Sequence, residues 1–417
     1  MDIKINFLDY EQLGQTREFI FGKKKVEIDV VKIPIEKLAY NKKNGRIFLG
    51  VNEKEKLGID FSSMSLEEFN NEIEDIIWNY DEDKNKSTLE SIKAHGQLEI
   101  CLISDEGIII DGNRRFTCLR RLHRDFPEDN SFKYLKTCVL DQNIKEINNI
   151  DNKDIKRFEL NVQFGKEEKA DYHVIDRVMS IYSEVKSNNL SIDEIAEDMN
   201  ISKNVIDQTC RTAELIEDFL DHFKIYQKYF VVDKLDLVNP FIELANFLKS
   251  TNVKDLTDTE RNKRKNIFYE LALSSNFDLP TQSLRNGLIK NIYKNADTQL
   301  TKDFITEYED TIAQDIFSSI QEIDFDDPKQ ARNDFNNLES VKDLNKLFIK
   351  YKEKGGLKRT IEEQLDLAEK AKNSLLEIDL RLFDAVVADD NANSTYIKIQ
   401  NTLKDAKKIL ESLIDES

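Results

Sequence analysis

Cysteine, histidine, proline and glycine are all scarce in this chain of 417 residues. The four cysteines (Cys101, Cys118, Cys138 and Cys210) are far apart and form no CxxC pair, and the four histidines are equally dispersed. This spacing does not predict a zinc site, and it is typical of small core thiols in a reducing compartment. Only 5 prolines and 12 glycines occur, which predicts a mainly helical chain with short connections.

Long apolar runs are also missing. No stretch approaches the roughly 20 residues of a membrane span, and the first residues lack the apolar core of a signal peptide. We therefore expect a cytoplasmic protein with no membrane partner. The formal net charge of -19 argues against non-specific adhesion to nucleic acid over the whole surface. It leaves room for a local basic patch or for a protein partner.

The stretch from Gly107 to Arg121 has the clearest chemistry. Ile108 to Ile110 predicts a short buried strand, and Asp111-Gly112 favours a turn. Phe116, Leu119 and Leu122 then recur at helical spacing. Two arginines, Arg114 and Arg115, fall in the first turn of this helix, where unpaired N–H groups also point outward. The pattern indicates a phosphate site, and the alternative is that both arginines are simply solvated.

The surrounding residues predict a small domain in which strands and helices alternate. We expect strands at 25–35, 97–103 and 136–140, and a helix at 64–80. Residues 81–86 are expected to form a charged connection. A second helix should begin at Ser87, with Glu90 completing a capping box, and should end at Gly96.

Four motifs in this order resemble the N-terminal domain of the ParB/sulfiredoxin superfamily. They are Ile-Pro-Ile-Glu-Lys-Leu at 33–38, Asn-Gly-Arg at 44–46, the helix that ends at Gly96, and Asp-Gly-Asn-Arg-Arg at 111–115. The resemblance covers roughly residues 25–165. Asn113 stands where sulfiredoxin has its catalytic cysteine, so we do not expect reduction of a sulfinic acid.

The resemblance implies a nucleoside triphosphate pocket for CTP or ATP, with Mg²⁺. The identity of the base stays open. Glu159 and Asn161 would hold the magnesium ion, although their spacing departs by one residue from the Glu-Asn pair of ParB, and a solvated helix face is the alternative. The implied nucleotide contacts are Arg46, Gly96, Gln97, Asp111, Gly112, Asn113, Arg114 and Arg115.

Residues 190–206 have the spacing of a helix-turn-helix. Ser191 and Glu194 form a capping box, and Asn200 can adopt the left-handed conformation of the turn. The unit resembles the DNA-binding helix-turn-helix that follows the nucleotide domain in ParB. Its second helix would present side chains that can contact bases and phosphates. These are Lys203, Asn204, Gln208 and Arg211. Asp207 and the acidic first helix favour the alternative of a packing unit.

The remainder of the chain is expected to be helical. Residues 323–328 look like an acidic linker. Beyond it, apolar residues from Ile361 to Leu382 follow steps of three and four, which predicts either a coiled-coil seam or a hairpin core with a last helix at 396–414. The expected domains are a ParB/sulfiredoxin-like domain at 1–165, a helix-turn-helix domain at 166–230 and a helical region at 231–417, which a break near 323–328 would divide into two subdomains.

The expected fold class is thus an α+β domain of ParB/sulfiredoxin type followed by an all-α helix-turn-helix and helical C-terminal region. The leading hypothesis is a nucleotide-dependent DNA-binding protein with protein contacts or self-association through the C-terminal helices. A second hypothesis is a nuclease or nucleotide hydrolase of a phage-defence or mobile-element system, in which Asp111 would hold a metal. A third is a scaffold or transcription regulator with a vestigial pocket.

Overall fold

The computed structural model describes residues 4–42, 44, 47–56, 58–164, 174–274, 280–293, 299–376, 398–408 and 411. It divides the chain into two compact units, Met1–Lys352 and Glu353–Ser417. Among the described residues, no helix combines the length and apolar character that crossing a bilayer requires.

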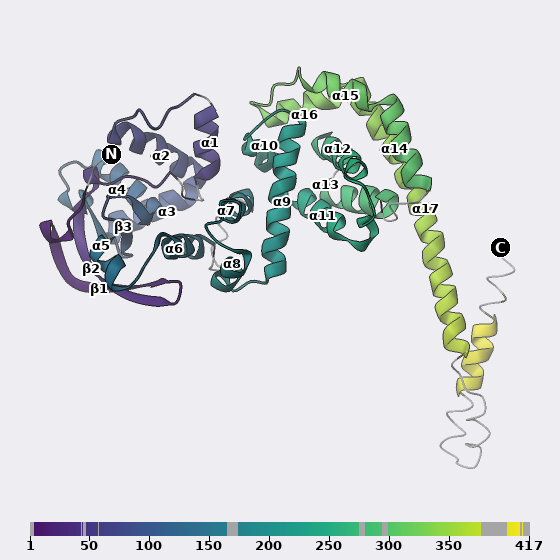
Figure 1. The fold of residues 1–417 in the computed structure, drawn as a ribbon, viewed down its shortest axis with the longest axis horizontal. Helices are drawn as coiled ribbons and strands as arrows, with labels where there is room; N and C mark the ends of the chain where they lie inside the picture. Colours follow the sequence, from purple (N-terminus) through teal and green to yellow (C-terminus); the bar gives the residue numbers. More distant parts are fainter. Residues whose placement is uncertain are drawn as a thin grey trace, which may run out of the picture. The chain divides into compact units, whose positions relative to one another are not determined.

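The N-terminal part of the first unit is built on a five-stranded sheet (Figure 1). Its strands are β1 (Glu11–Phe21), β2 (Lys24–Pro34), β3 (Cys101–Ser104), β4 (Ile109–Asp111) and β5 (Tyr134–Leu140), in the order β1-β2-β5-β3-β4. Only β3 and β5 run parallel, and the other neighbouring pairs are antiparallel. The predicted strands are confirmed, although β3 begins at Cys101 rather than at residue 97.

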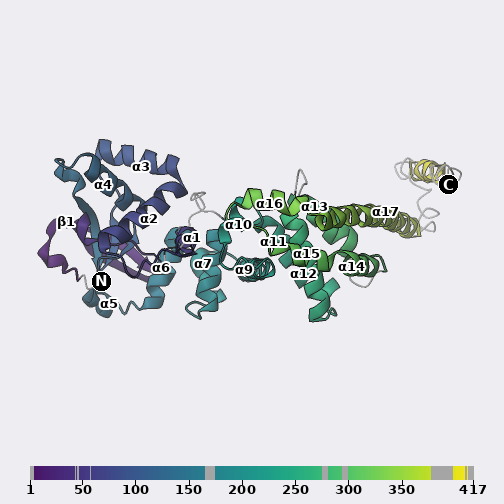
Figure 2. The same ribbon diagram turned by 90° about the horizontal axis from the view of Figure 1, so that it is seen from above.

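Helices cover both faces of this sheet, and alternate strand residues supply the two cores. Val31, Ile103 and Ile109 pack with helices α2 (Leu66–Tyr80), α3 (Glu82–His95) and α4 (Asn113–Asp125). Val30, Leu102 and Ile110 pack on the side of α6 (Asn152–Phe164). Figures 1 and 2 show α2–α4 on one side of the sheet and α5 and α6 on the other. The helices of this part are α1 (Phe48–Lys56), α2 (Leu66–Tyr80), α3 (Glu82–His95), α4 (Asn113–Asp125), α5 (Gln142–Ile147) and α6 (Asn152–Phe164).

Helix α3 begins five residues before the predicted start, so the prediction of a connection at 81–86 and a capping box at Ser87 is wrong. Asp81 is the N-cap and accepts a hydrogen bond from the Lys84 N–H. The reason is a tertiary contact: the Asn85 amide donates to the carbonyls of Ile77 and Trp78 at the end of α2, at 2.7 and 3.0 Å. The predicted C-cap is confirmed, because Gly96 follows the helix with φ 73°.

The rest of the first unit is helical and has one continuous hydrophobic core, which runs from Ile175 to Tyr351 and also includes Leu160 of α6. The two helices and the turn predicted at 190–206 are present, with a capping box at Ser191 and Asn200 in the left-handed conformation. Within the acidic stretch 323–328, Phe325 is buried and its ring lies 5.9 Å from that of Phe223. The helices are α7 (Val174–Lys186), α8 (Ile192–Met199), α9 (Lys203–His222), α10 (Tyr229–Lys234), α11 (Val238–Lys249), α12 (Asp258–Ser274), α13 (Pro280–Ser283), a π-helix (Leu284–Tyr293), α14 (Gln299–Thr311), α15 (Ala313–Ile320), α16 (Pro328–Asn337) and the start of α17 (Glu339–Leu376).

The second unit contains the later part of α17 and a helical segment at 398–408. The apolar side chains of α17 in this unit are exposed, among them Leu357, Ile361 and Leu365. Ala368 and Ala371 of the predicted apolar pattern are also exposed, and its last residues, from Leu375 to Leu382, lie outside the described side chains.

Candidate functional site

The predicted strand–turn–helix at 107–121 is confirmed, and Gly112 is its pivot. Gly112 is the N-cap of α4, with φ 114°, and it provides no side-chain cap to the first turn. Its Cα faces Cys101 so closely that an added Cβ would overlap the sulfur and lie 2.9 Å from the Cys101 Cβ. Burial raises the pKa of the Cys101 thiol to about 12, so the sulfur is a neutral packing group.

The two arginines of the first turn each lie beside a carboxylate. The Arg115 guanidinium donates to the Ile100 carbonyl at 2.9 Å and to Asp111 Oδ2 at 3.2 Å. The Arg114 guanidinium lies 3.6 Å from Asp81 Oδ2. Asp81 was not a predicted site residue, although its position as an Asp before a polar, helix-favouring run was a usable signal. A bound phosphate would therefore replace carboxylate partners rather than meet free cations.

The Gln97 amide nitrogen lies 3.5 Å from the Cys101 sulfur, which faces Gly112, but the Gln97 side chain is engaged with the sheet. Its amide oxygen accepts from the Lys136 N–H at 2.8 Å, and its amide nitrogen donates to the Lys136 carbonyl at 2.7 Å. Both bonds imitate the pairing of a strand residue, so the side chain continues the pairing along β5 ahead of Cys101, the first residue of β3. Gln97 thus positions the segment before β3, and its amide is already occupied.

A small cavity lies beside α4, between α2, α3 and the residue that follows the Asn44-Gly45-Arg46 motif. It is lined by Ile47, Ile77, Tyr80, Asn85, Asn113 and Arg114. The side-chain oxygens of Asn85 and Asn113 are buried without a hydrogen-bond partner, at residue exposures of 1% and 7%. Such oxygens need a donor. Arg46, the predicted contact from this loop, lies outside the described residues.

The two predicted magnesium ligands are not brought together. Glu159 is buried on α6, accepts from the Asn41 amide at 2.8 Å and from the Lys156 ammonium at 2.7 Å, whereas Asn161 is exposed. Residues two apart on a helix face different directions, which explains the separation. Burial raises the pKa of the Glu159 carboxyl. The described residues contain no group of three His, Cys, Asp or Glu side chains that could hold a metal ion.

Helix α6 also carries the contacts to the helix-turn-helix. The Arg157 guanidinium donates to both oxygens of Asp198 at 2.5 Å, and the Lys153 ammonium lies 2.6 Å from Glu194. Lys23, in the β1–β2 turn, pairs with Glu197 at 2.8 Å. Three acidic residues of α8, Glu194, Glu197 and Asp198, therefore bind the sheet-containing part. The fourth, Asp193, pairs with Lys203 of α9. Asp207 of α9 pairs with Lys249 and Arg211.

This interface should weaken in acid. The bonds from Lys153 and Ser191 lower the pKa of the Glu194 carboxyl to about 2. A depressed carboxyl pKa gives stability above the unfolded value of about 4.5, and this stability is lost as the pH falls towards the folded value. We expect Glu194→Gln to destabilise the protein slightly at pH 7, with the difference from wild type shrinking between about pH 4.5 and 2. Urea unfolding at several pH values measures it, and a constant difference would contradict the assignment.

The predicted DNA-contacting residues of α9 fall into two groups. Lys203 and Asn204 are exposed in the first turn, where a recognition helix meets base edges, and Lys203 pairs with Asp193 at 2.9 Å. Gln208 and Arg211 instead bond α11, through the Asn246 side chain at 2.6 Å and the Ala245 carbonyl at 3.1 Å. A mixed-charge cavity of about 620 Å³ lies where α9, α11 and α12 meet, lined in part by Arg211.

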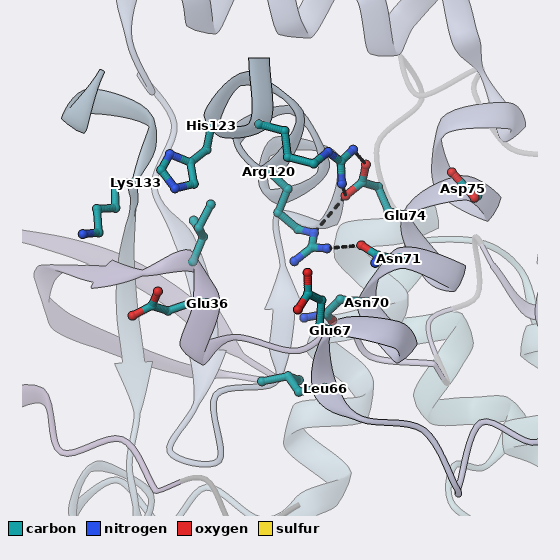
Figure 3. Close-up of a pocket in the computed structure, with 12 residues that line it drawn as sticks. Glu36, Leu66, Glu67, Asn70, Asn71, Glu74, Asp75, Arg120, His123 and Lys133 are labelled. Atoms are coloured by element: carbon teal, nitrogen blue, oxygen red, sulfur yellow. Dashed lines mark hydrogen bonds and ion pairs between the residues drawn. The ribbon is translucent and has the colours of Figure 1, made fainter. Parts of the chain in front are cut away.

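A charge cluster between α2 and α4 was missed entirely. Glu74, on α2, is buried and contacts the guanidinium groups of Arg120, Arg121 and Arg124 on α4. Figure 3 shows Arg120 directed at Glu74 and Asn71, with His123 and Lys133 on the opposite wall of the cavity. This cavity of about 620 Å³ is lined by side chains of both signs. The cluster joins residues 46–50 positions apart, so no local pattern could have indicated it.

Comparison with known proteins gives no identification: no protein-family model and no curated protein matches this chain.

Proposed function

We propose that this chain is a ParB-like, nucleotide-dependent DNA-binding protein, in which a triphosphate at the start of α4 controls the helix-turn-helix through α6. The observation that carries the proposal is the position of α6. Glu159 of this helix accepts from Asn41, in the loop that leads to Arg46, and Arg157 of the same helix holds Asp198 of α8. One rigid element thus joins the loop beside the candidate pocket to the candidate DNA-binding unit.

Three features support a nucleotide at α4. Its first turn has no side-chain cap, so backbone N–H groups are available to phosphate. Arg114 and Arg115 lie in that turn and can exchange Asp81 and Asp111 for phosphate oxygens. The unpartnered oxygens of Asn85 and Asn113 suit a donor such as a base amino group. Mg²⁺ would arrive with the phosphates, because this ion is commonly held by substrate oxygens and one or two carboxylates.

In the proposed mechanism, nucleotide binding changes the contact between α6 and the loop that carries Asn41. A triphosphate bound at the first turn of α4, beside Arg114, would draw Arg46 towards α4 and move the loop that carries Asn41. Because Asn41 bonds Glu159, this movement reaches α6, and the ion pairs of Arg157 and Lys153 pass it to α8. The orientation of Lys203 and Asn204 towards DNA would change with it.

The first test is calorimetric titration with CTP, ATP and GTP in the presence of Mg²⁺. We expect micromolar binding of one nucleotide and at least about tenfold weaker binding by Arg114→Ala, because one charge-assisted phosphate contact is lost. Arg17→Ala is the matched control, since Arg17 is an exposed arginine on β1. Absence of binding to all three nucleotides, or an unchanged affinity in Arg114→Ala, would refute the pocket.

The coupling has its own test. Arg157→Ala should bind nucleotide like wild type but lose the effect of nucleotide on DNA affinity, because the Asp198 contact is removed. Lys23→Ala, which removes a more exposed ion pair with Glu197 at the same interface, should keep most of the effect. Fluorescence anisotropy with duplex DNA, with and without nucleotide, reports both. Equal behaviour of the two variants would argue against transmission through Arg157.

The enzymatic hypothesis gains no support from the position of Asp111, whose carboxylate holds Arg115. Incubation of plasmid DNA with Mg²⁺ or Mn²⁺ tests it directly. Cleavage that disappears in Asp111→Ala would favour a nuclease over the switch.

A further inference from the structure

The second unit exposes an apolar strip on α17. Leu357, Ile361 and Leu365 are 66%, 61% and 60% exposed, and each lies four residues from the next. At 100° per residue they fall on one face of the helix, together with Ala368. Single exposed apolar residues are ordinary, but three long aliphatic side chains in line form a contact surface.

Charge is divided on either side of Ile361. Residues 353–360 contain Lys354, Lys358 and Arg359 with one carboxylate, Glu353. Residues 362–369 contain only carboxylates as charged groups, including Glu363 and Asp366. The helix is thus basic for eight residues before Ile361 and acidic for the eight residues that follow. Two copies of this helix are therefore complementary in charge when they run antiparallel.

We propose that this strip binds the same strip of a second copy of the chain, with the two helices antiparallel and the two-fold axis at Ile361. In this arrangement Leu357 of one copy packs on Leu365 of the other, because both are four residues from Ile361. Lys354 of one copy faces Glu369 of the other, because the two residues lie on the same flank of the strip, seven and eight residues from Ile361. A parallel pair would place the basic halves together and the acidic halves together. A uniformly basic or acidic partner would match only half of the strip.

The apolar strip is short, since Leu357 and Leu365 are about 12 Å apart along the helix. The dimer should therefore form and dissociate readily, and its population should depend on protein concentration. It does not rest on the nucleotide site, so either proposal can fail alone.

Cysteine crosslinking of the full chain tests whether the α17 helices of two copies meet and whether they run antiparallel. The four natural cysteines are all buried, so introduced thiols on α17 dominate oxidation. Leu357→Cys and Leu365→Cys are prepared on chains with different tags and mildly oxidised, separately and mixed. We expect a disulfide-linked heterodimer from the mixture, at least about tenfold above the homodimer of either variant alone. Asn373→Cys is the control that should not crosslink, because it lies twelve residues beyond Ile361 and the two copies of this position are about 36 Å apart along an antiparallel pair.

Two outcomes would overturn the proposal. Homodimers of Leu357→Cys alone would show a parallel pair, and no crosslink in the mixture above the Asn373→Cys background would show that the strip does not meet a second copy. Sedimentation over a concentration series gives an independent readout. Wild type should become heavier with concentration, Ile361→Asp should stay monomeric, and Asn373→Asp should behave like wild type.

Discussion

Replacing Glu74 with alanine should destabilise the N-terminal part by about 3–5 kcal/mol, the range for breaking a buried ion pair by removal of one partner. The Glu74 side chain is 2% exposed and is the common carboxylate of Arg120, Arg121 and Arg124. The Arg120 side chain is itself mostly buried, so the variant leaves a desolvated cation that keeps its bond to the Asn71 oxygen but has lost the Glu74 carboxylate. The loss of packing between α2 and α4 adds to this effect.

The matched control is Asp75→Ala, one residue further along α2. Asp75 is largely exposed and has one ion pair with Arg121 at 3.6 Å, so the expected change is below about 1 kcal/mol. Urea unfolding can be followed through Trp78, the only tryptophan of the chain, whose ring lies 3.8 Å from the Arg121 guanidinium. Similar unfolding midpoints for the two variants would contradict a central role for Glu74.

Gly112→Ala should be the second severe change, because it combines an unfavourable φ with a steric overlap. A φ of 114° is rarely adopted by residues with a Cβ, at a cost of order 1–3 kcal/mol. The new Cβ would also overlap the Cys101 sulfur. We expect a loss of at least about 3 kcal/mol, because overpacking of a close contact adds roughly 1–3 kcal/mol to the backbone strain.

A double-mutant cycle separates the two causes. Cys101→Ala removes the sulfur and relieves part of the overlap, while the strain at Gly112 stays. The double variant should therefore be more stable than the sum of the two single changes predicts. Gly58→Ala, at φ 86° with open space around the added Cβ, isolates the backbone term. If the changes in the free energy of unfolding at positions 101 and 112 are strictly additive, the Cys101 sulfur is not what opposes a Cβ at position 112.

The sequence was sufficient where local chemistry determines the structure. Three isoleucines, Asp-Gly and the spacing of Phe116 and Leu119 predicted β4, the turn and α4, and the capping box of α8 was equally local. Prediction was wrong at the start of α3, where Asp81 and Ser87 are both acceptable N-caps. The bonds of Asn85 to the end of α2 select the earlier one, and that contact between two helices leaves no trace in the local pattern.

The sequence predicted the glycine and the two arginines of the site, but not the residues that contact them. Arg114, Arg115 and Gly112 are placed together, but Asp81 is the N-cap of α3 and Asn85 comes from the first turn of that helix. The magnesium pair was inferred from the resemblance to ParB, in which the two ligands are adjacent. In this chain one residue separates Glu159 from Asn161, so the two side chains point in different directions from the helix. For α9, the spacing of apolar residues predicted the helix. The hydrogen bonds of Gln208 and Arg211 to α11 depend on packing between segments that are distant in the sequence, so the sequence did not predict them.

The strand order also has a consequence for the timing of folding. Val30 of β2 pairs with Cys138 of β5, more than a hundred residues later, and the Phe19 and Phe21 rings pack on Phe158 of α6. The hairpin made by β1 and β2 therefore leaves the ribosome long before its neighbouring strand and its covering helix exist. Closing such a long loop is slow, whereas α8 and α9 can form from neighbouring residues as soon as they are synthesised. A nascent chain that ends before residue 164 exposes this aromatic face to other chains.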